Sequence, residues 1–106
     1  MEPPERSFID RYSLLHFFSG VVARFLGIHK VVWLLIHVLF ELVENSKYGM
    51  EFINLLPFWP GGKDHADSWD NMLGDTFYAV LGHYVAFMLQ EAWLVVLFGL
   101  SLFLFG

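Results

Sequence analysis

The sequence predicts an all-α membrane protein, a compact bundle of three to four transmembrane helices with an interfacial aromatic loop between the second and third. Of the 106 residues, 57% are hydrophobic and only 16% are charged, whereas soluble domains carry about 25% charged residues. Apolar runs of helical length recur along the chain, and lipid is the natural solvent for such runs. The length allows one domain, so residues 1–106 are expected to form a single polytopic membrane domain.

The first transmembrane helix is expected at residues 9–26, after a polar tail at residues 1–8, with Asp10 capping its free amides. Gly27 then favours a tight turn, because glycine tolerates the backbone angles found just past a helix end. The second helix is expected at residues 30–46. No small-residue cleavage pattern accompanies the first apolar run, so we expect it to be retained rather than removed as a signal peptide.

The segment at residues 47–66 mixes aromatic side chains with glycine and proline, which is typical of a loop at headgroup level. Within it, residues 49–56 have the pattern of a short amphipathic helix. Pro57 is expected to end that helix, because proline lacks the backbone donor that a helix needs. We therefore expect this segment to lie on the membrane surface.

A third transmembrane helix is expected at residues 68–89, opened by Asp67 or Ser68. A polar break follows at residues 90–91. Residues 92–105 are then an uncharged run of 14 residues, shorter than the roughly 20 needed to cross a bilayer. This run is either a thin fourth span, a short terminal helix or a continuation of the third helix.

Basic residues set the expected orientation. With four spans, Arg6, Arg11, Lys47 and Lys63 fall on one side of the membrane, and the positive-inside tendency makes that side cytoplasmic. We therefore expect an integral, multi-pass membrane protein with both termini and the aromatic loop in the cytoplasm.

Charge and cysteine content exclude several classes of function. The net charge is −5 and no basic run suits a phosphate backbone, so nucleic acid is not an expected partner. The absence of cysteine excludes disulfides and thiolate metal sites, which leaves His, Asp, Glu and Asn as metal ligands. The expected partners are membrane lipid and either other membrane proteins or further copies of this chain.

Each of the three predicted helices carries polar side chains at helical spacing on one face. Lipid cannot satisfy these groups, so we expect the three faces to meet inside the bundle, where the histidine and asparagine donors serve the carboxylates. The polar cluster predicted in this way consists of His16, His37, Glu41, Glu44, Asn45, Asp67, Asn71 and Asp75.

Clustered carboxylates at bilayer depth indicate a site, because each one costs at least about 2.5 kcal/mol there. Their repulsion must be relieved by raised pKa values, protonated histidine, Arg24 or a bound cation. For a divalent cation the expected ligands are Glu41, Asp75 and His16, with Asn71 beside them. Oxygen ligands favour Mg²⁺, Ca²⁺ or Mn²⁺, and histidine shifts the preference toward Mn²⁺ or Zn²⁺. Metal-activated water could hydrolyse an ester or phosphate bond, so whether the protein is an enzyme stays open.

Structural interpretations stay open for the same residues. Asp67 and Asp70 have the spacing of an N-cap and first helical turn. Glu44 lies where a helix end reaches the headgroup layer, and His83 can simply bond to a neighbouring helix. A polar network without ligand is the alternative for the whole cluster.

The order of these motifs resembles the VanZ-like family of small integral membrane proteins, especially its relatives with Glu-x-x-Glu-Asn and Asp-Ser-x-x-Asn-x-x-Gly patterns. The matching pieces are a Leu-Leu-His-Phe-Phe run that ends in Gly20, the Glu-Leu-Val-Glu-Asn-Ser at residues 41–46, and residues 67–75 leading to Gly82. The resemblance covers about residues 10–85. The chain departs from the pattern by carrying Glu-Asn where many members have Gln, and by lacking an arginine in the following loop.

The resemblance implies a polar site in a membrane protein and no particular reaction. VanZ-like proteins are linked to resistance to lipid-targeting glycopeptide antibiotics. Three functions fit this expectation. The first is binding of a lipid headgroup or divalent cation, the second is a structural role without catalysis in a larger viral or organellar membrane complex, and the third is proton or ion conduction.

Overall fold

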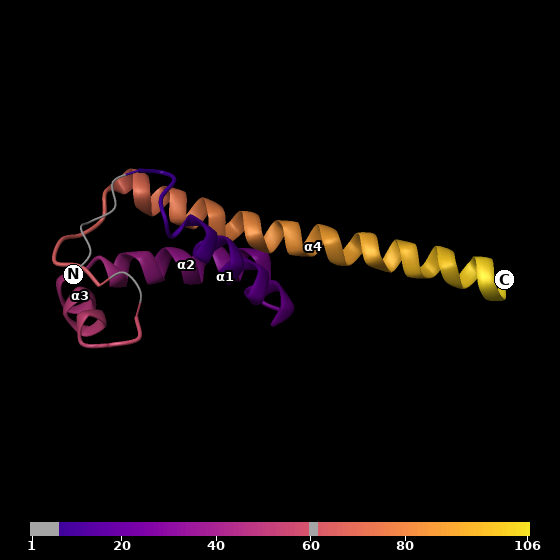
Figure 1. Ribbon diagram of the computed structural model, residues 1–106, viewed down its shortest axis with the longest axis horizontal. Coiled ribbons are helices and arrows are strands. Elements are labelled where there is room, and N and C mark those ends of the chain that lie inside the picture. Colours follow the sequence, from indigo (N-terminus) through magenta and orange to yellow (C-terminus); the bar gives the residue numbers. More distant parts are fainter. Residues whose placement is uncertain (1–6, 60–61) are drawn as a thin grey trace.

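The computed structural model describes residues 7–59 and 62–106, so residues 1–6 of the predicted tail at residues 1–8 and two loop residues at 60–61 lie outside the described ranges. The described chain forms four helices, α1 (Ser13–Phe25), α2 (Lys30–Glu44), α3 (Lys47–Asn54) and α4 (Trp69–Phe105). In Figure 1, α1 and α2 lie beside the first half of α4, while the second half of α4 extends alone. The longest dimension is 61 Å and the other two are 23 Å.

The predicted bundle of three to four transmembrane helices is wrong, although the described chain is all-helical. α1 has 13 residues and α2 has 15, which gives lengths of about 20 and 23 Å against about 30 Å of hydrocarbon. Among the described helices, only α4 is long and apolar enough to cross a membrane. The prediction was based on the apolar content of the chain, but the number of transmembrane helices depends on how long each helix is.

Local contacts set these helix ends. Gly27 adopts φ 80° and ends the α1 turn in the left-handed conformation that glycine tolerates. At the start of α4 the Ser68 hydroxyl accepts a hydrogen bond from the Asn71 amide at 3.2 Å. Asp10 was expected to cap α1, but Tyr12 holds the N-cap position. The Tyr12 amide donates a hydrogen bond to the Asp10 carboxylate at 2.6 Å.

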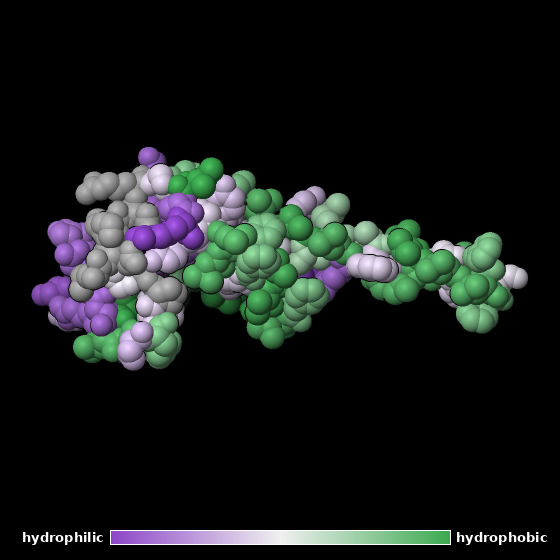
Figure 2. All heavy atoms as spheres, viewed as in Figure 1, coloured by the Kyte–Doolittle hydropathy of each residue, from purple (hydrophilic) through white to green (hydrophobic). Residues whose placement is uncertain are grey.

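α4 runs for 37 residues without a break at Gln90 and Glu91. The predicted third helix and the apolar run after it are therefore one helix. Its most apolar stretch of 18 residues contains no buried residue, and Ala86 is the last buried residue of α4, so this stretch lies within residues 87–105. Figure 2 shows mostly hydrophobic residues along this half and most of the hydrophilic ones at the other end of the molecule.

Two glycines allow α1 and α4 to approach closely. A Cβ atom on Gly20 would collide with the carbonyl oxygen of Ala79, and one on Gly82 would collide with that of Phe17. Small residues let two helix backbones approach closely, and here they bring the polar face of α1 onto that of α4.

Two long-range hydrogen bonds fix α2 and the turn before it against α4. The Trp33 indole donates to the carbonyl oxygen of Ala79 at 2.9 Å. Nε2 of His83 lies 2.6 Å from the carbonyl oxygen of Ile28, which is the structural role that the sequence allowed for this histidine. The polar residues of three helices therefore share one interior.

Candidate metal centre

Two histidines from different helices meet where α1, α2 and α4 come together. Nδ1 of His16 on α1 lies 3.0 Å from Nε2 of His37 on α2. The two rings meet edge to face, with centroids 5.1 Å apart. His37 is only 3% exposed, so its ring nitrogens depend on protein partners.

Glu41 lies one helical turn after His37 and completes a triangle of ligand atoms. Its Oε1 is 3.8 Å from Nε2 of His37 and 3.9 Å from Nδ1 of His16. A triangle with sides of 3.0, 3.8 and 3.9 Å has a centre about 2.1 Å from each corner, which is the length of zinc bonds to imidazole and carboxylate. We call these three residues the metal triangle.

The second nitrogen of each histidine ring faces a partner on α4. Nε2 of His16 lies 3.2 Å from Oδ2 of Asp75, and Nδ1 of His37 lies 3.2 Å from the Thr76 hydroxyl. Metal-binding histidines usually donate this N–H to a carboxylate or another oxygen, which fixes the tautomer and aims the lone pair at the metal. When both rings donate to α4, the two nitrogens in the metal triangle carry the lone pairs and are free to ligate a metal ion.

Carboxylate oxygens inside the cluster remain without partners. Oε1 of Glu41 and Oδ1 of Asp75 are buried and have no hydrogen-bond partner among the described residues. Burial, reinforced by the Asp75 carboxylate, raises the pKa of Glu41 to about 9. Burial, with the His16 ring nearby, lowers the pKa of His37 to about 4. The metal-free cluster therefore favours uncharged forms of both side chains.

A second set of oxygen ligands adjoins the metal triangle and shares one residue with it. Glu41, Asp67 and Asp75 each offer a carboxylate oxygen, and the three oxygens lie within 4.8 Å of one another. Oxygen-only sets suit hard cations such as Mg²⁺ and Ca²⁺. The cluster therefore offers one mixed nitrogen and oxygen position and one oxygen-only position.

Lys63 neutralises part of this negative charge from inside the protein, where it is 3% exposed. Its ammonium group donates to Asn45 at 2.8 Å and to Asp67 at 2.5 Å, and lies 3.9 Å from Glu44. Burial raises the pKa of Glu44, and the charge of Lys63 opposes that effect. The burial of Lys63 was not expected from the sequence, in which the one signal for its ion pair with Asp67 is their four-residue spacing.

The side chains of the two predicted asparagines donate hydrogen bonds to neighbouring groups. Asn71 donates to the Asp10 carboxylate and, at 3.0 Å, to the Ser7 carbonyl oxygen, which ties the N-terminal segment to α4. Asn45 donates to the backbone of Glu41 at 2.9 Å and to its carboxylate at 3.4 Å. The eight predicted residues thus form three groups. The residues of the metal triangle lie with Asp75. Glu44, Asn45 and Asp67 lie around the ammonium group of Lys63, and Asn71 contacts Asp10.

The chain matches no family model, no curated protein and no solved structure in three comparisons with known proteins. The resemblance to VanZ-like proteins and the ion-conduction hypothesis therefore stay predictions.

Proposed function

We propose that α4 holds this protein in a membrane and that the metal triangle binds one divalent transition-metal ion. The observation that carries this proposal is the spacing of the three ligand atoms, whose common centre lies about 2.1 Å from each. Two imidazoles and one carboxylate suit Zn²⁺ best among common ions, and also Fe²⁺ and Mn²⁺. Three protein ligands leave a further position open to water or to a ligand.

The surroundings of the triangle support a cation. A metal ion would give the unpartnered Oε1 of Glu41 a partner and would offset the nearby Asp67 and Asp75 carboxylates. Both histidines already have an oxygen partner on the side of the ring that faces away from the triangle. Such partners raise the basicity of the ligating nitrogen.

Metal binding by the full chain in detergent tests the proposal. After removal of metal with a chelator, calorimetry and metal analysis should find one Zn²⁺ per chain, bound more tightly than Mg²⁺. H37Q and E41Q should each weaken Zn²⁺ binding by more than about 100-fold, because each removes a ligand. E41Q should still fold, because the raised pKa shows that the metal-free protein favours a neutral side chain at this position.

The matched control is H65Q, because His65 lies in the loop with its side chain 73% exposed and faces Asp64 rather than the triangle. H65Q should leave Zn²⁺ binding unchanged. Absence of Zn²⁺ binding in the wild-type protein, or an equal loss in H65Q and E41Q, would refute the proposed site.

An apolar face on α2 favours a structural role in an assembly as a second function. Leu35, Leu39 and Val43 follow at four-residue spacing and are 63%, 63% and 54% exposed. Contiguous exposed apolar side chains mark surfaces that lipid or another protein covers. If copies of this chain associate there, light scattering in mild detergent should find an oligomer for the wild-type protein and a monomer for Leu39→Ser. A monomer for both proteins would exclude self-association at this face.

A further inference from the structure

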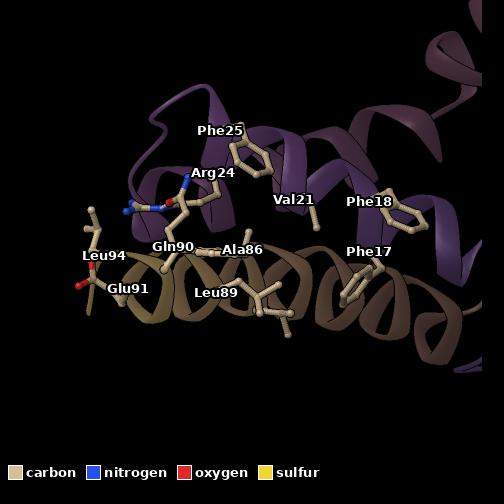
Figure 3. A pocket seen from close by; sticks show the side chains of 12 residues that line it. Phe17, Phe18, Val21, Arg24, Phe25, Ala86, Leu89, Gln90, Glu91 and Leu94 are labelled. Atoms are coloured by element: carbon tan, nitrogen blue, oxygen red, sulfur yellow. Dashed lines mark hydrogen bonds between the residues drawn. The ribbon is translucent and has the colours of Figure 1, made fainter. Parts of the chain in front are cut away.

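An apolar groove of about 630 Å³ lies between α1 and α4, and no residue of the metal triangle lines it. Figure 3 shows its walls, which include Phe18, Val21 and Phe25 from α1 and Leu89 and Leu94 from α4. Aromatic and aliphatic side chains line most of the groove, so its walls suit a hydrocarbon chain.

One end of the groove carries two opposite charges that do not pair with each other. Arg24 donates through Nε to the Gln90 side chain at 2.7 Å, and its guanidinium lies 4.8 Å from the centre of the Phe87 ring. Among the described residues, no carboxylate forms an ion pair with Arg24, and its terminal nitrogens make no hydrogen bond. Glu91 lines the groove at the same end (Figure 3) and is exposed.

These charges lie where the apolar half of α4 begins. Phe87, Gln90 and Glu91 belong to the first turns of residues 87–105, which contain the apolar stretch of 18 residues. That stretch is about 27 Å long, close to the thickness of the hydrocarbon layer. In a bilayer entered by this stretch, Arg24 and Glu91 therefore lie near the phosphate and amine groups of the lipids.

We propose that the groove binds one zwitterionic, amine-bearing phospholipid from the membrane that α4 enters. The lipid phosphate accepts hydrogen bonds from the terminal nitrogens of Arg24, and the lipid ammonium donates to the Glu91 carboxylate. An acyl chain covers the apolar walls. An anionic lipid such as phosphatidylglycerol has the same phosphate but no ammonium to offset the charge of Glu91, and a choline lipid has no N–H to donate. The unpaired opposite charges therefore favour an ethanolamine headgroup.

Native mass spectrometry of the full chain in detergent tests this with three lipids of identical acyl chains. Wild-type protein should retain phosphatidylethanolamine best, phosphatidylcholine less and phosphatidylglycerol least. R24Q should weaken binding of all three lipids about fivefold, as expected for one basic side chain near a membrane surface. E91Q should weaken phosphatidylethanolamine binding and improve phosphatidylglycerol binding, so the preference between them disappears.

Matched controls are R11Q and E51Q, which remove an exposed arginine and an exposed glutamate outside the groove. Both should keep the wild-type order of lipids. Equal retention of the three lipids by wild-type protein, or equal effects of R24Q and R11Q, overturns the proposal. Because Glu91 is exposed, E91Q tests the headgroup preference in a folded protein even if R24Q fails to fold. Zn²⁺ binding by the metal triangle should be unchanged in E91Q, so the two proposals fail separately.

Discussion

His16 lies between the metal triangle and Asp75, with Nδ1 3.0 Å from His37 and Nε2 3.2 Å from the Asp75 carboxylate. Thr76, the next residue on α4, stands in the same relation to His37. Two neighbouring residues of one helix therefore orient both imidazoles, which come from two other helices. This arrangement separates residues that would bind the metal from residues that position the ligands.

Asp75→Asn should weaken Zn²⁺ binding about 10- to 100-fold without preventing it, because Asp75 orients His16 and raises the basicity of its ring. Calorimetry on the metal-free protein in detergent measures this effect. Asp70→Asn is the matched control, since Asp70 is exposed in the first turn of the same helix. Equal losses in the two variants would show that Asp75 has no special relation to the site.

The metal-free protein should lose stability as the pH rises from about 6.5 to about 9. The pKa of Glu41 is about 9 in the folded state against an ordinary 4.5, so its contribution is complete below pH 4.5 and lost as the pH rises through 9. His37 has a pKa of about 4 against 6.5, so its contribution is complete above pH 6.5 and lost as the pH falls through 4. Above pH 6.5 the Glu41 effect is therefore unopposed by His37.

Thermal unfolding in detergent across this range measures the slope, which is at most about 1.4 kcal/mol per pH unit for one proton. E41Q should reduce the slope, because Gln does not titrate, while Glu44 and Asp75, whose pKa values are also raised by burial, keep part of it. With Zn²⁺ bound the trend should reverse, because metal binding requires the deprotonated carboxylate. A slope in E41Q equal to that of wild type would assign the titration to another group.

Lys63→Met should lower the free energy of unfolding by about 3 kcal/mol, because it removes a buried cation from the half-buried Asp67 and Glu44 carboxylates. Chemical unfolding of the metal-free protein gives this value. Lys47→Met removes an exposed lysine instead, and its effect should stay within about 0.5 kcal/mol. A loss below 1 kcal/mol for Lys63→Met, by the same measurement, would show that Lys63 does not stabilise these carboxylates.

Gly82→Ala should destabilise the protein by about 1–3 kcal/mol, because the added methyl group collides with the Phe17 carbonyl oxygen and separates α1 from α4. Gly99→Ala is the matched control in the same helix, since a Cβ there meets no atom within 4 Å. That change should be neutral or stabilising by up to about 1 kcal/mol, as expected for alanine in a helix. Similar effects at both positions would contradict the close approach of the two helices.

The convergence of His16, His37 and Glu41 could be predicted from the sequence for two reasons. His37 and Glu41 are four residues apart and so share a helix face, and polar side chains in an apolar chain gather away from lipid. The burial of Lys63 could not be predicted in this way, because it depends on a loop. There the backbone of Lys63 forms two hydrogen bonds with the Asn54 side chain, at 2.5 and 2.7 Å.

The predicted number of transmembrane helices was wrong for a related reason. Apolar residues at helical spacing occur in both α1 and α2, but helix length depends on the turn at Gly27 and on the chain reversal after Glu44. Gln90 and Glu91 suggested a break by their polarity, yet both are good helix formers and α4 continues through them. Apolar composition alone therefore did not give the number of helices that could cross a membrane.

α4 continues without interruption from Asp75 to its apolar half, so a single rod joins the residues that orient both imidazoles to the stretch proposed to enter the membrane. Helices adapt to thicker or thinner bilayers by changing their tilt. If both proposals hold, a change of tilt in that stretch would be carried along the rod to Asp75 and Thr76.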